Sequence, residues 1–252
     1  MPWSPSSTER FMQCPMRWWL DRQGVIGRAR DESAMEQGSA FHAAMAWYWA
    51  AGDSVRGKAN DPLITRAVER TIEQEGAELR EQGIVCVECV LGGTPEEIAR
   101  HGRYPGTADL VTDNGSGLTV TDYKTKNTLQ PAYVDSELRQ TQRSWQFKQY
   151  AWFVQQRFER PVTHVRKLLV AFKPSLRVWL ATYPITQHAL SQWYIQAQAV
   201  WRLMDRMEKP LTPFEKPWQN ADACERYGWQ HRCDHYETCW DGQPIEYKEN
   251  AQ

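Results

Sequence analysis

Residues 106–125 have the sequence GTADLVTDNGSGLTVTDYKT, and this stretch decides the fold. Two runs rich in β-branched and apolar residues, Gly106 to Val111 and Leu118 to Lys124, predict two strands. The segment between them contains Asp113-Asn114-Gly115-Ser116-Gly117, a composition typical of a tight hairpin turn. The stretch therefore predicts a β-hairpin that belongs to a larger sheet.

The hairpin gathers charged side chains on one patch. If its centre lies between Gly115 and Ser116, Asp109 stands directly opposite Asp122, with Cβ atoms about 4.5–5.5 Å apart. Lys124 shares a face with Asp122 because side chains alternate along a strand. Opposed like charges destabilise a sheet, and a divalent cation would offset that repulsion. We therefore predict a metal site here, the alternative being a solvated Asp122–Lys124 ion pair on an edge strand.

The donor atoms indicate which metal and which chemistry to expect. Oxygen-rich sites favour Mg²⁺ or Mn²⁺. Such an ion, held by carboxylates, can polarise a phosphodiester and lower the pKa of a bound water. A lysine beside it could orient that water or stabilise developing charge. The patch thus favours phosphodiester hydrolysis.

Outward from the hairpin, the chain alternates between helical and strand patterns. A capping box precedes the first helix, and Pro15 should break that helix just after Cys14. The other predicted elements are listed here in chain order: helices 32–50 and 61–81, a strand 83–91, a helix 134–157, strands 165–172 and 178–183, and a helix from 186 to just before 210. This order predicts one α/β domain over residues 1–252. Its parts are a helical part (1–82), a core (83–208) and a cysteine-containing tail (209–252).

Four segments resemble the motifs of the PD-(D/E)XK nuclease superfamily. GTADLV and DYKT resemble its signature, while Gly38-x-x-x-His42 and Gln146-x-x-x-Tyr150 resemble motifs of its RecB-like branch. Residues four apart on a helix are neighbours, so both members of each pair face one side. The resemblance implies a restriction-endonuclease-like core, with a central mixed sheet flanked by helices and an N-terminal helical elaboration.

The resemblance also implies a role for each matched residue in the reaction. His42, Asp109 and Asp122 would bind the metal together with the backbone carbonyl of Tyr123. Lys124 would position the attacking water.

Residues outside the metal set have implied roles as well. Gln146 and Tyr150 would hold the active site or the DNA strand. Glu88 lies on the preceding predicted strand and would support the metal ligands from outside.

The cysteines point to a second cofactor. Relatives of the CRISPR-associated Cas-four type carry one N-terminal and three C-terminal cysteines around a [4Fe-4S] cluster, which needs four thiolates. The matching residues here are Cys14, Cys224, Cys233 and Cys239. The tail lacks the C-x-x-C step of those relatives, so zinc bound by the same cysteines with His231 or His235 stays open. Cys86 and Cys89 lie in the predicted strand 83–91 and are expected to be packing residues on opposite faces.

Composition excludes several classes of protein. The 252 residues carry 30 basic and 31 acidic side chains, so the chain is no polycation and any nucleic-acid contact must be local. Residues 160–177 hold five basic and no acidic side chains, which fits either a phosphate contact or a solvated strand face. No run approaches the ~20 apolar residues of a membrane helix, and residues 1–5 lack a signal-peptide pattern. A cytoplasmic address is expected.

The resemblance implies a metal-dependent DNA exonuclease that acts on ends in recombination, repair or CRISPR adaptation. Because the sequence has no P-loop motif, it would act alone or with a helicase, recombinase or CRISPR-adaptation partner. The alternatives are an endonuclease, a non-catalytic DNA- or partner-binding protein of the same fold, and a zinc-stabilised interaction module. Cleavage polarity, strand preference and oligomeric state are left open by the sequence.

Overall fold

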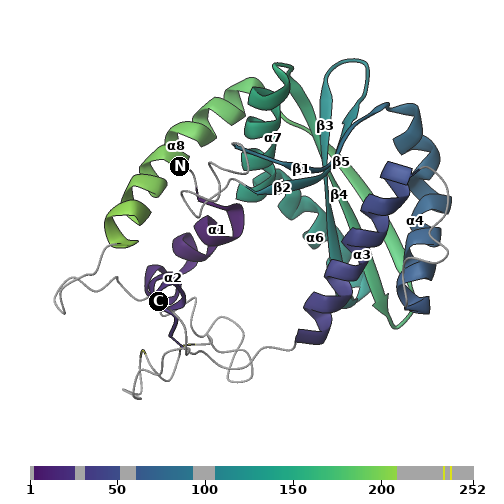
Figure 1. Ribbon diagram of the computed structural model, residues 1–252, viewed down its shortest axis with the longest axis horizontal. Coiled ribbons are helices and arrows are strands. Elements are labelled where there is room, and N and C mark those ends of the chain that lie inside the picture. The colour runs from purple at the N-terminus through teal and green to yellow at the C-terminus, as the bar shows by residue number, and fades with distance from the viewer. Residues whose placement is uncertain are drawn as a thin grey trace. The chain divides into compact units, whose positions relative to one another are not determined.

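The computed structural model describes residues 3–25, 32–51, 61–92 and 106–208, together with residues 235 and 239. Its helices and strands follow one another along the chain (Figure 1) as α1 (Pro5–Gln13), α2 (Pro15–Arg22), α3 (Glu32–Ala51), α4 (Pro62–Glu81), β1 (Ile84–Val90), β2 (Thr107–Asp113), β3 (Leu118–Thr128), α6 (Pro131–Arg143), α7 (Trp145–Phe158), β4 (Val162–Lys173), β5 (Arg177–Pro184) and α8 (Gln187–Glu208). The chain separates into two compact units, a sheet unit (31–194) and a terminal unit (1–30 with 195–252).

The sheet unit contains one five-stranded sheet in the order β1-β2-β3-β4-β5. Neighbouring strands are antiparallel except β3 and β4, which run parallel. The expected central mixed sheet is therefore confirmed, and both groups of predicted strands belong to it.

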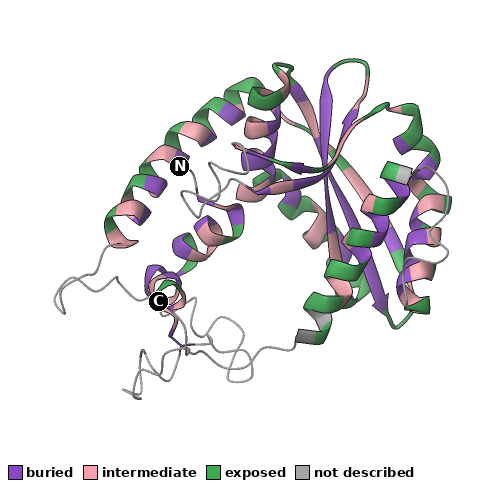
Figure 2. Cartoon of the chain, in the orientation of Figure 1, coloured by how far each residue is buried: buried purple, intermediate pink, exposed green. Residues whose placement is uncertain are grey.

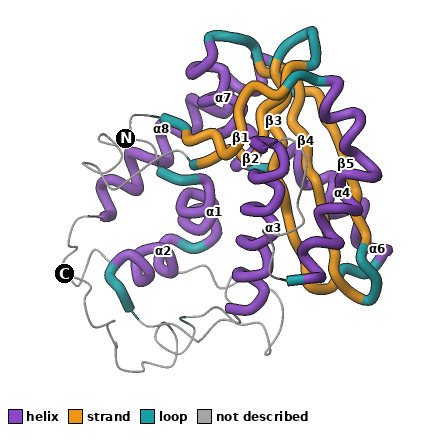
Figure 3. Tube along the Cα trace, turned by 45° about the vertical axis from the view of Figure 1, so that its right-hand side comes forward, coloured by secondary structure: helices purple, strands orange, loops and turns teal. Residues whose placement is uncertain are grey.

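Helices cover both faces of this sheet (Figure 3). On β4, Leu168 and Val170 pack into a core with α3 and α4, whereas Leu169 and Ala171 pack with Val134 of α6. On β3, Val120 packs with α7. Because side chains alternate along a strand, the two sets lie on opposite faces. Figure 2 shows the buried residues concentrated in the central strands.

The predicted hairpin register is confirmed. In the ladder between β2 and β3, Leu110 pairs with Thr121 and Val111 with Val120. Gly115 closes the turn at φ 81°, a backbone conformation that favours glycine. The ladder ends at the pair of Leu110 and Thr121, and Asp109 and Asp122 are the next residue on each strand.

The prediction of one continuous helix over 134–157 is wrong, because the structure has two helices there, α6 and α7. Ser144 adopts an extended conformation, with ψ 129°, between α6 and α7. Its N–H donates to the carbonyl of Thr141, which closes α6. No proline or glycine marks this break, so local sequence patterns do not predict it. The break places Gln146 in the first turn of α7.

The terminal unit is organised around the start of the chain. As predicted, the helix breaks at Pro15, because α1 ends at Gln13 and α2 begins at Pro15. Trp18 is buried against Trp3 and Phe11 in edge-to-face contacts.

Among the described helices, none combines the length and the apolar character that a membrane span requires.

The basic stretch 160–177 is not a uniform charged surface. Arg166 is 1% and Lys167 6% exposed, and each is held in an ion pair with a glutamate. Arg160 pairs with Asp113 at the hairpin turn. Three of the five cations therefore already have acidic partners within the protein, and the innermost two are buried.

Candidate functional site

The hairpin places its two central carboxylates in a buried setting. Asp109 is 5% and Asp122 2% exposed. Lys124 Nζ lies 2.8 Å from Asp122 Oδ2 and 3.1 Å from Oδ1. Asp109 Oδ2 accepts a hydrogen bond from the Tyr123 backbone N–H at 2.5 Å. Because β3 is a central strand and Asp122 is buried, the alternative of a solvated pair on an edge strand is excluded.

Helix α3 brings the histidine to the carboxylates. His42 Nδ1 lies 3.0 Å from Asp109 Oδ1. One turn earlier, a Cβ on Gly38 would come within 2.9 Å of Thr125 Oγ1 on β3. Glycine therefore allows α3 to approach β3 closely at the turn that presents His42.

Helix α7 contacts the centre from the other face of the sheet. Gln146 Nε2 donates to Asp122 Oδ1 at 3.0 Å and to the Tyr150 hydroxyl at 2.9 Å. Tyr150 is buried in the core beneath α7. Asp122 is thus held by Lys124 on its own strand and by Gln146 on a helix.

Glu88 is the residue whose importance the sequence understated. Potential metal-binding atoms of His42, Glu88 and Asp109 lie within 4.8 Å of one another. In the β1–β2 register Glu88 falls opposite Asp109, between the pairs formed by Val87 and Cys89. Its φ of 47° is costly for a residue with a side chain, and such strain is concentrated at functional sites. The sequence signal at this position is that Glu88 is the one acidic residue in the otherwise apolar strand β1.

We call the set His42, Glu88, Asp109, Asp122, Lys124, Gln146 and Tyr150 the candidate centre. The structure thus brings together all the side chains that the sequence singled out for the reaction. Tyr123, predicted to act through its carbonyl, is buried, and its hydroxyl accepts a hydrogen bond from Trp49 Nε1 at 3.0 Å.

Electrostatics favour a cation at this centre. Burial, together with the charge of Asp109, outweighs the opposing effect of Lys124 and raises the pKa of Asp122 to about 6. Burial and Asp109 also raise the pKa of Glu88. Although burial lowers the pKa of His42, its hydrogen bond and charge interaction with Asp109 outweigh this, and the pKa is raised. Burial is the main cause of both raised carboxyl pKa values and the charge of Asp109 adds to it, so a bound cation would favour the ionised carboxylates.

The donor set fits a divalent cation. Asp122 Oδ2 is buried and, despite its proximity to Lys124, takes part in no hydrogen bond of regular geometry. Carboxylate oxygens with one imidazole suit Mg²⁺ or Mn²⁺.

Two of the four cysteines predicted to bind a cluster, Cys14 and Cys239, are among the described residues. Cys14 and Cys239 belong to one apolar cluster with Met16, Leu20 and Val25. Cys224, Cys233 and His231 lie outside the described residues. His235 is buried, with Nε2 2.8 Å from Asp21 Oδ1.

The expectation that Cys86 and Cys89 lie on opposite faces of a regular strand is wrong. Both pack into the same core cluster. Burial and the neighbouring Cys86 thiol raise the pKa of Cys89 to about 12. A register shift between Ile84 and Cys86 and the left-handed Glu88 interrupt the alternation of β1. The expected packing role agrees with this burial.

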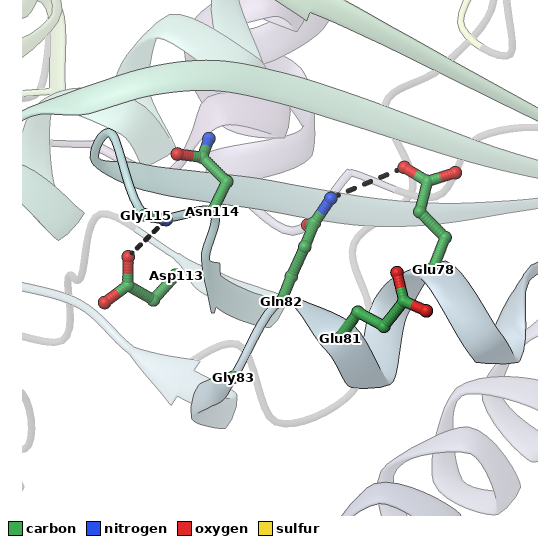
Figure 4. Close-up of a pocket in the computed structure, with 7 residues that line it drawn as sticks. All are labelled: Glu78, Glu81, Gln82, Gly83, Asp113, Asn114 and Gly115. Carbon is green, nitrogen blue, oxygen red and sulfur yellow. Dashed lines mark hydrogen bonds between the residues drawn. The ribbon is translucent and has the colours of Figure 1, made fainter.

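A cavity of about 400 Å³ lies elsewhere in the sheet unit (Figure 4). It shares no residue with the candidate centre and is lined by Glu78, Glu81, Gln82, Gly83, Asp113, Asn114 and Gly115. Its three carboxylates would repel a polyanion, so it is no candidate for binding nucleic acid.

The chain matches one protein-family model and is distantly similar to solved structures. The sequence model of the PD-(D/E)XK nuclease superfamily matches residues 2–239. A crystal structure of a candidate exonuclease from Eubacterium rectale is similar at 10% identity and a TM-score of 0.44, covering 88% of this chain and 78% of that one. The crystal structure of SSO0001 is similar at 12% identity and a TM-score of 0.24, covering 68% and 81%. No curated protein matches the sequence.

Proposed function

The chain belongs to the PD-(D/E)XK nuclease superfamily, and from that membership we propose that it is a metal-dependent deoxyribonuclease acting on DNA ends. The observation that carries the proposal is that Asp109 and Asp122 are both buried and that Lys124 Nζ lies 2.8 Å from Asp122. Because the family match spans residues 2–239, we treat the two units as one functional nuclease domain.

His42, Glu88, Asp109, Asp122 and the carbonyl of Tyr123 would hold the metal. When bound, Mg²⁺ or Mn²⁺ would polarise the phosphate and supply a nucleophilic water. Glu88 enters this set because its carboxylate lies within 4.8 Å of the donor atoms of His42 and Asp109. The ring nitrogen of His42 that binds a cation would have to be unprotonated, while its other ring nitrogen could keep a hydrogen bond to a carboxylate such as Asp109.

The remaining residues act on water and on geometry. Lys124 presents an ammonium group to the attacking water and to charge developing on the phosphate. Gln146 fixes the orientation of the Asp122 carboxylate, and Tyr150 fixes Gln146 in turn. These contacts hold the carboxylate before substrate arrives, which is how preorganised sites lower the cost of reaction.

We also propose that Cys14, Cys224, Cys233 and Cys239 bind a [4Fe-4S] cluster with a structural role. The support is that Cys14 and Cys239, from opposite ends of the chain, share one apolar cluster. Zinc is the alternative. Iron and sulfide analysis with an absorption spectrum on anaerobically purified protein separates the two, since zinc sites are colourless.

The exonuclease assignment is tested on DNA with and without ends. Purified protein with Mn²⁺ or Mg²⁺ is incubated with end-labelled linear DNA and with a covalently closed circle. Loss of the linear DNA alone is the expected result, and Lys124→Ala should abolish it. Cutting of both substrates would move the assignment to an endonuclease.

The same experiment addresses the second class of function. No cleavage of either substrate, by protein with intact metal content, would favour a DNA- or partner-binding protein. A helicase, recombinase or CRISPR-adaptation partner would then be sought by testing for cleavage after addition of that partner. The identity of a partner that restores cleavage would indicate whether the protein acts in recombination, repair or CRISPR adaptation.

A further inference from the structure

A line of cations leads from the candidate centre to the surface along β3. Asp122, Lys124 and Lys126 are successive alternate residues, so they share one face and stand about 6.6–6.8 Å apart. The exposed fraction of the side chain rises from 3% at Asp122 to 37% at Lys124 and 42% at Lys126. A strand whose reacting phosphate lies at Lys124 would therefore pass Lys126 on its way to solvent.

Lys126 can leave its present partner at low cost. Its Nζ lies 3.1 Å from Glu137 Oε1 on α6. Glu137 also binds Lys167, whose Nζ lies 3.2 Å from Oε2 and donates to the Glu137 carbonyl at 2.9 Å. Lys167 is buried and stays in place, so Glu137 keeps a cation when Lys126 turns away. Exposed ion pairs are weak, so a phosphate can compete for Lys126.

An exposed aromatic side chain lies one helical turn from that glutamate. Tyr133 is in the first turn of α6 and is 60% exposed. Tyr133 and Glu137 are four residues apart and therefore neighbours on the helix surface. Cations that follow a backbone, with an aromatic ring on which bases stack, are the common means of binding single-stranded nucleic acid.

We propose that the nuclease holds its DNA as a single strand that runs from Lys124 past Lys126 to Tyr133. Lys126 binds the phosphate next to the reacting one, and Tyr133 stacks on an unpaired base. A duplex offers no such base, since its bases stack on one another. This inference rests on the proposed nuclease function and adds the strand state of the substrate.

The test measures binding without cleavage, by fluorescence anisotropy of a labelled single strand and of a duplex of equal length. The parent protein carries Asp109→Asn to stop cleavage. Lys126→Ala should reduce the slope of log affinity against log salt by about 0.7 on the single strand. Arg70→Ala, an exposed cation paired with Glu73 on α4, is the matched control and should leave the slope unchanged.

Substitutions of Tyr133 separate stacking from simple packing. Tyr133→Ala should weaken single-strand binding about five- to a hundredfold and duplex binding less than twofold. Tyr133→Phe should restore affinity, and Tyr133→Leu should not, since only an aromatic face stacks.

Two results overturn the path itself: an unchanged salt slope in Lys126→Ala, or equal losses on both DNAs in Tyr133→Ala. These are distinguishable from failure of the proposed function. If the wild-type protein cleaves no DNA and the parent binds none, the proposed function fails and the path fails with it.

Discussion

The candidate centre and the Cys14–Cys239 cluster are stabilised in different ways. The carboxylates of the centre lie on neighbouring strands of a hairpin, and backbone pairing places them together without a ligand. Cys14 and Cys239 come from opposite ends of the chain and meet in a small apolar cluster. Bringing distant segments together costs loop-closure entropy. The difference teaches that a metal at the centre would serve chemistry, whereas a metal at the cysteines would serve stability.

Within the terminal unit, contacts between protein side chains also hold the two ends of the chain together, as a bound cluster would. Asp21 on α2 binds the buried His235, and Arg10 on α1 binds the same carboxylate. The Cys239 N–H donates to the carbonyl of His235, so the cysteine is fixed one turn from this pair. The two sites therefore differ in how far they depend on a bound metal, and three substitutions and one change of pH test this difference.

The largest effect is expected at the centre. Lys124→Ala should lower the rate of DNA cleavage about 10²- to 10³-fold, since it removes a charge aimed at the reacting group. Iron content should not change. The measurement is the initial rate on end-labelled DNA, with circular dichroism to confirm folding. The control is Lys148→Ala on α7, a cation outside the centre. A cleavage rate within tenfold of wild type would remove Lys124 from the reaction.

The next effect is expected in the terminal unit. Cys14→Ser should remove the bound metal and lower the free energy of unfolding by about 2–4 kcal/mol, by analogy with loss of a long-loop cross-link. Iron analysis and urea denaturation measure the two changes. Cys86→Ser, in the core of the sheet unit, should keep full iron content. Retention of iron in Cys14→Ser would contradict the cluster assignment.

The pH dependence of metal binding tests the centre alone. The pKa of Asp122 is raised to about 6 in the folded protein, so below pH 6 this carboxyl holds a proton that a metal must displace. Affinity for Mn²⁺ should therefore fall as pH drops through 6, about tenfold per pH unit for one released proton. In the absence of metal, pH acts on the stability of the protein with the opposite sign. The pKa of the Asp122 carboxyl is raised in the folded protein, so this group favours the folded state as pH falls.

Calorimetry in buffers of different ionisation enthalpy counts the released protons. Asp122→Asn should lower the number of protons released on Mn²⁺ binding by about one, while the proton of His42, whose pKa is also raised, is still released. A Mn²⁺ affinity that does not change between pH 5 and 7 would show that Asp122 is not a ligand.

The smallest effect is expected at the contact between α3 and β3. Gly38→Ala would place a Cβ 2.9 Å from Thr125 Oγ1, so it should destabilise the protein by about 1–3 kcal/mol and shift His42. Thermal unfolding and the Mn²⁺ affinity report these changes. Adding Thr125→Ala removes the contacting oxygen and should recover most of the loss. Without such recovery, the close approach would not explain the glycine.

Much of the centre could be predicted because it depends on local geometry. The turn at Asn114 and Gly115 fixes the register of β2 and β3, and the register brings Asp109 and Asp122 together. Glu88 could not be placed in the same way, because its position depends on the pairing of β1, on a register shift and on a left-handed backbone conformation. Strict alternation likewise failed for Cys86 and Cys89 in that strand.

The sequence by itself determined the strands of the hairpin, the break at Pro15, the helix starting at Asp61 and the spacing of the nuclease motifs. Each depends on turn chemistry, capping or periodicity over a few residues, which local physics controls. The position of Glu88 beside His42 and Asp109, the end of α6 at Arg143 before Gln146, and the burial of Arg166 and Lys167 became known only from the folded chain. Those outcomes depend on contacts between segments distant in sequence, whose geometry is set by packing of the whole sheet unit.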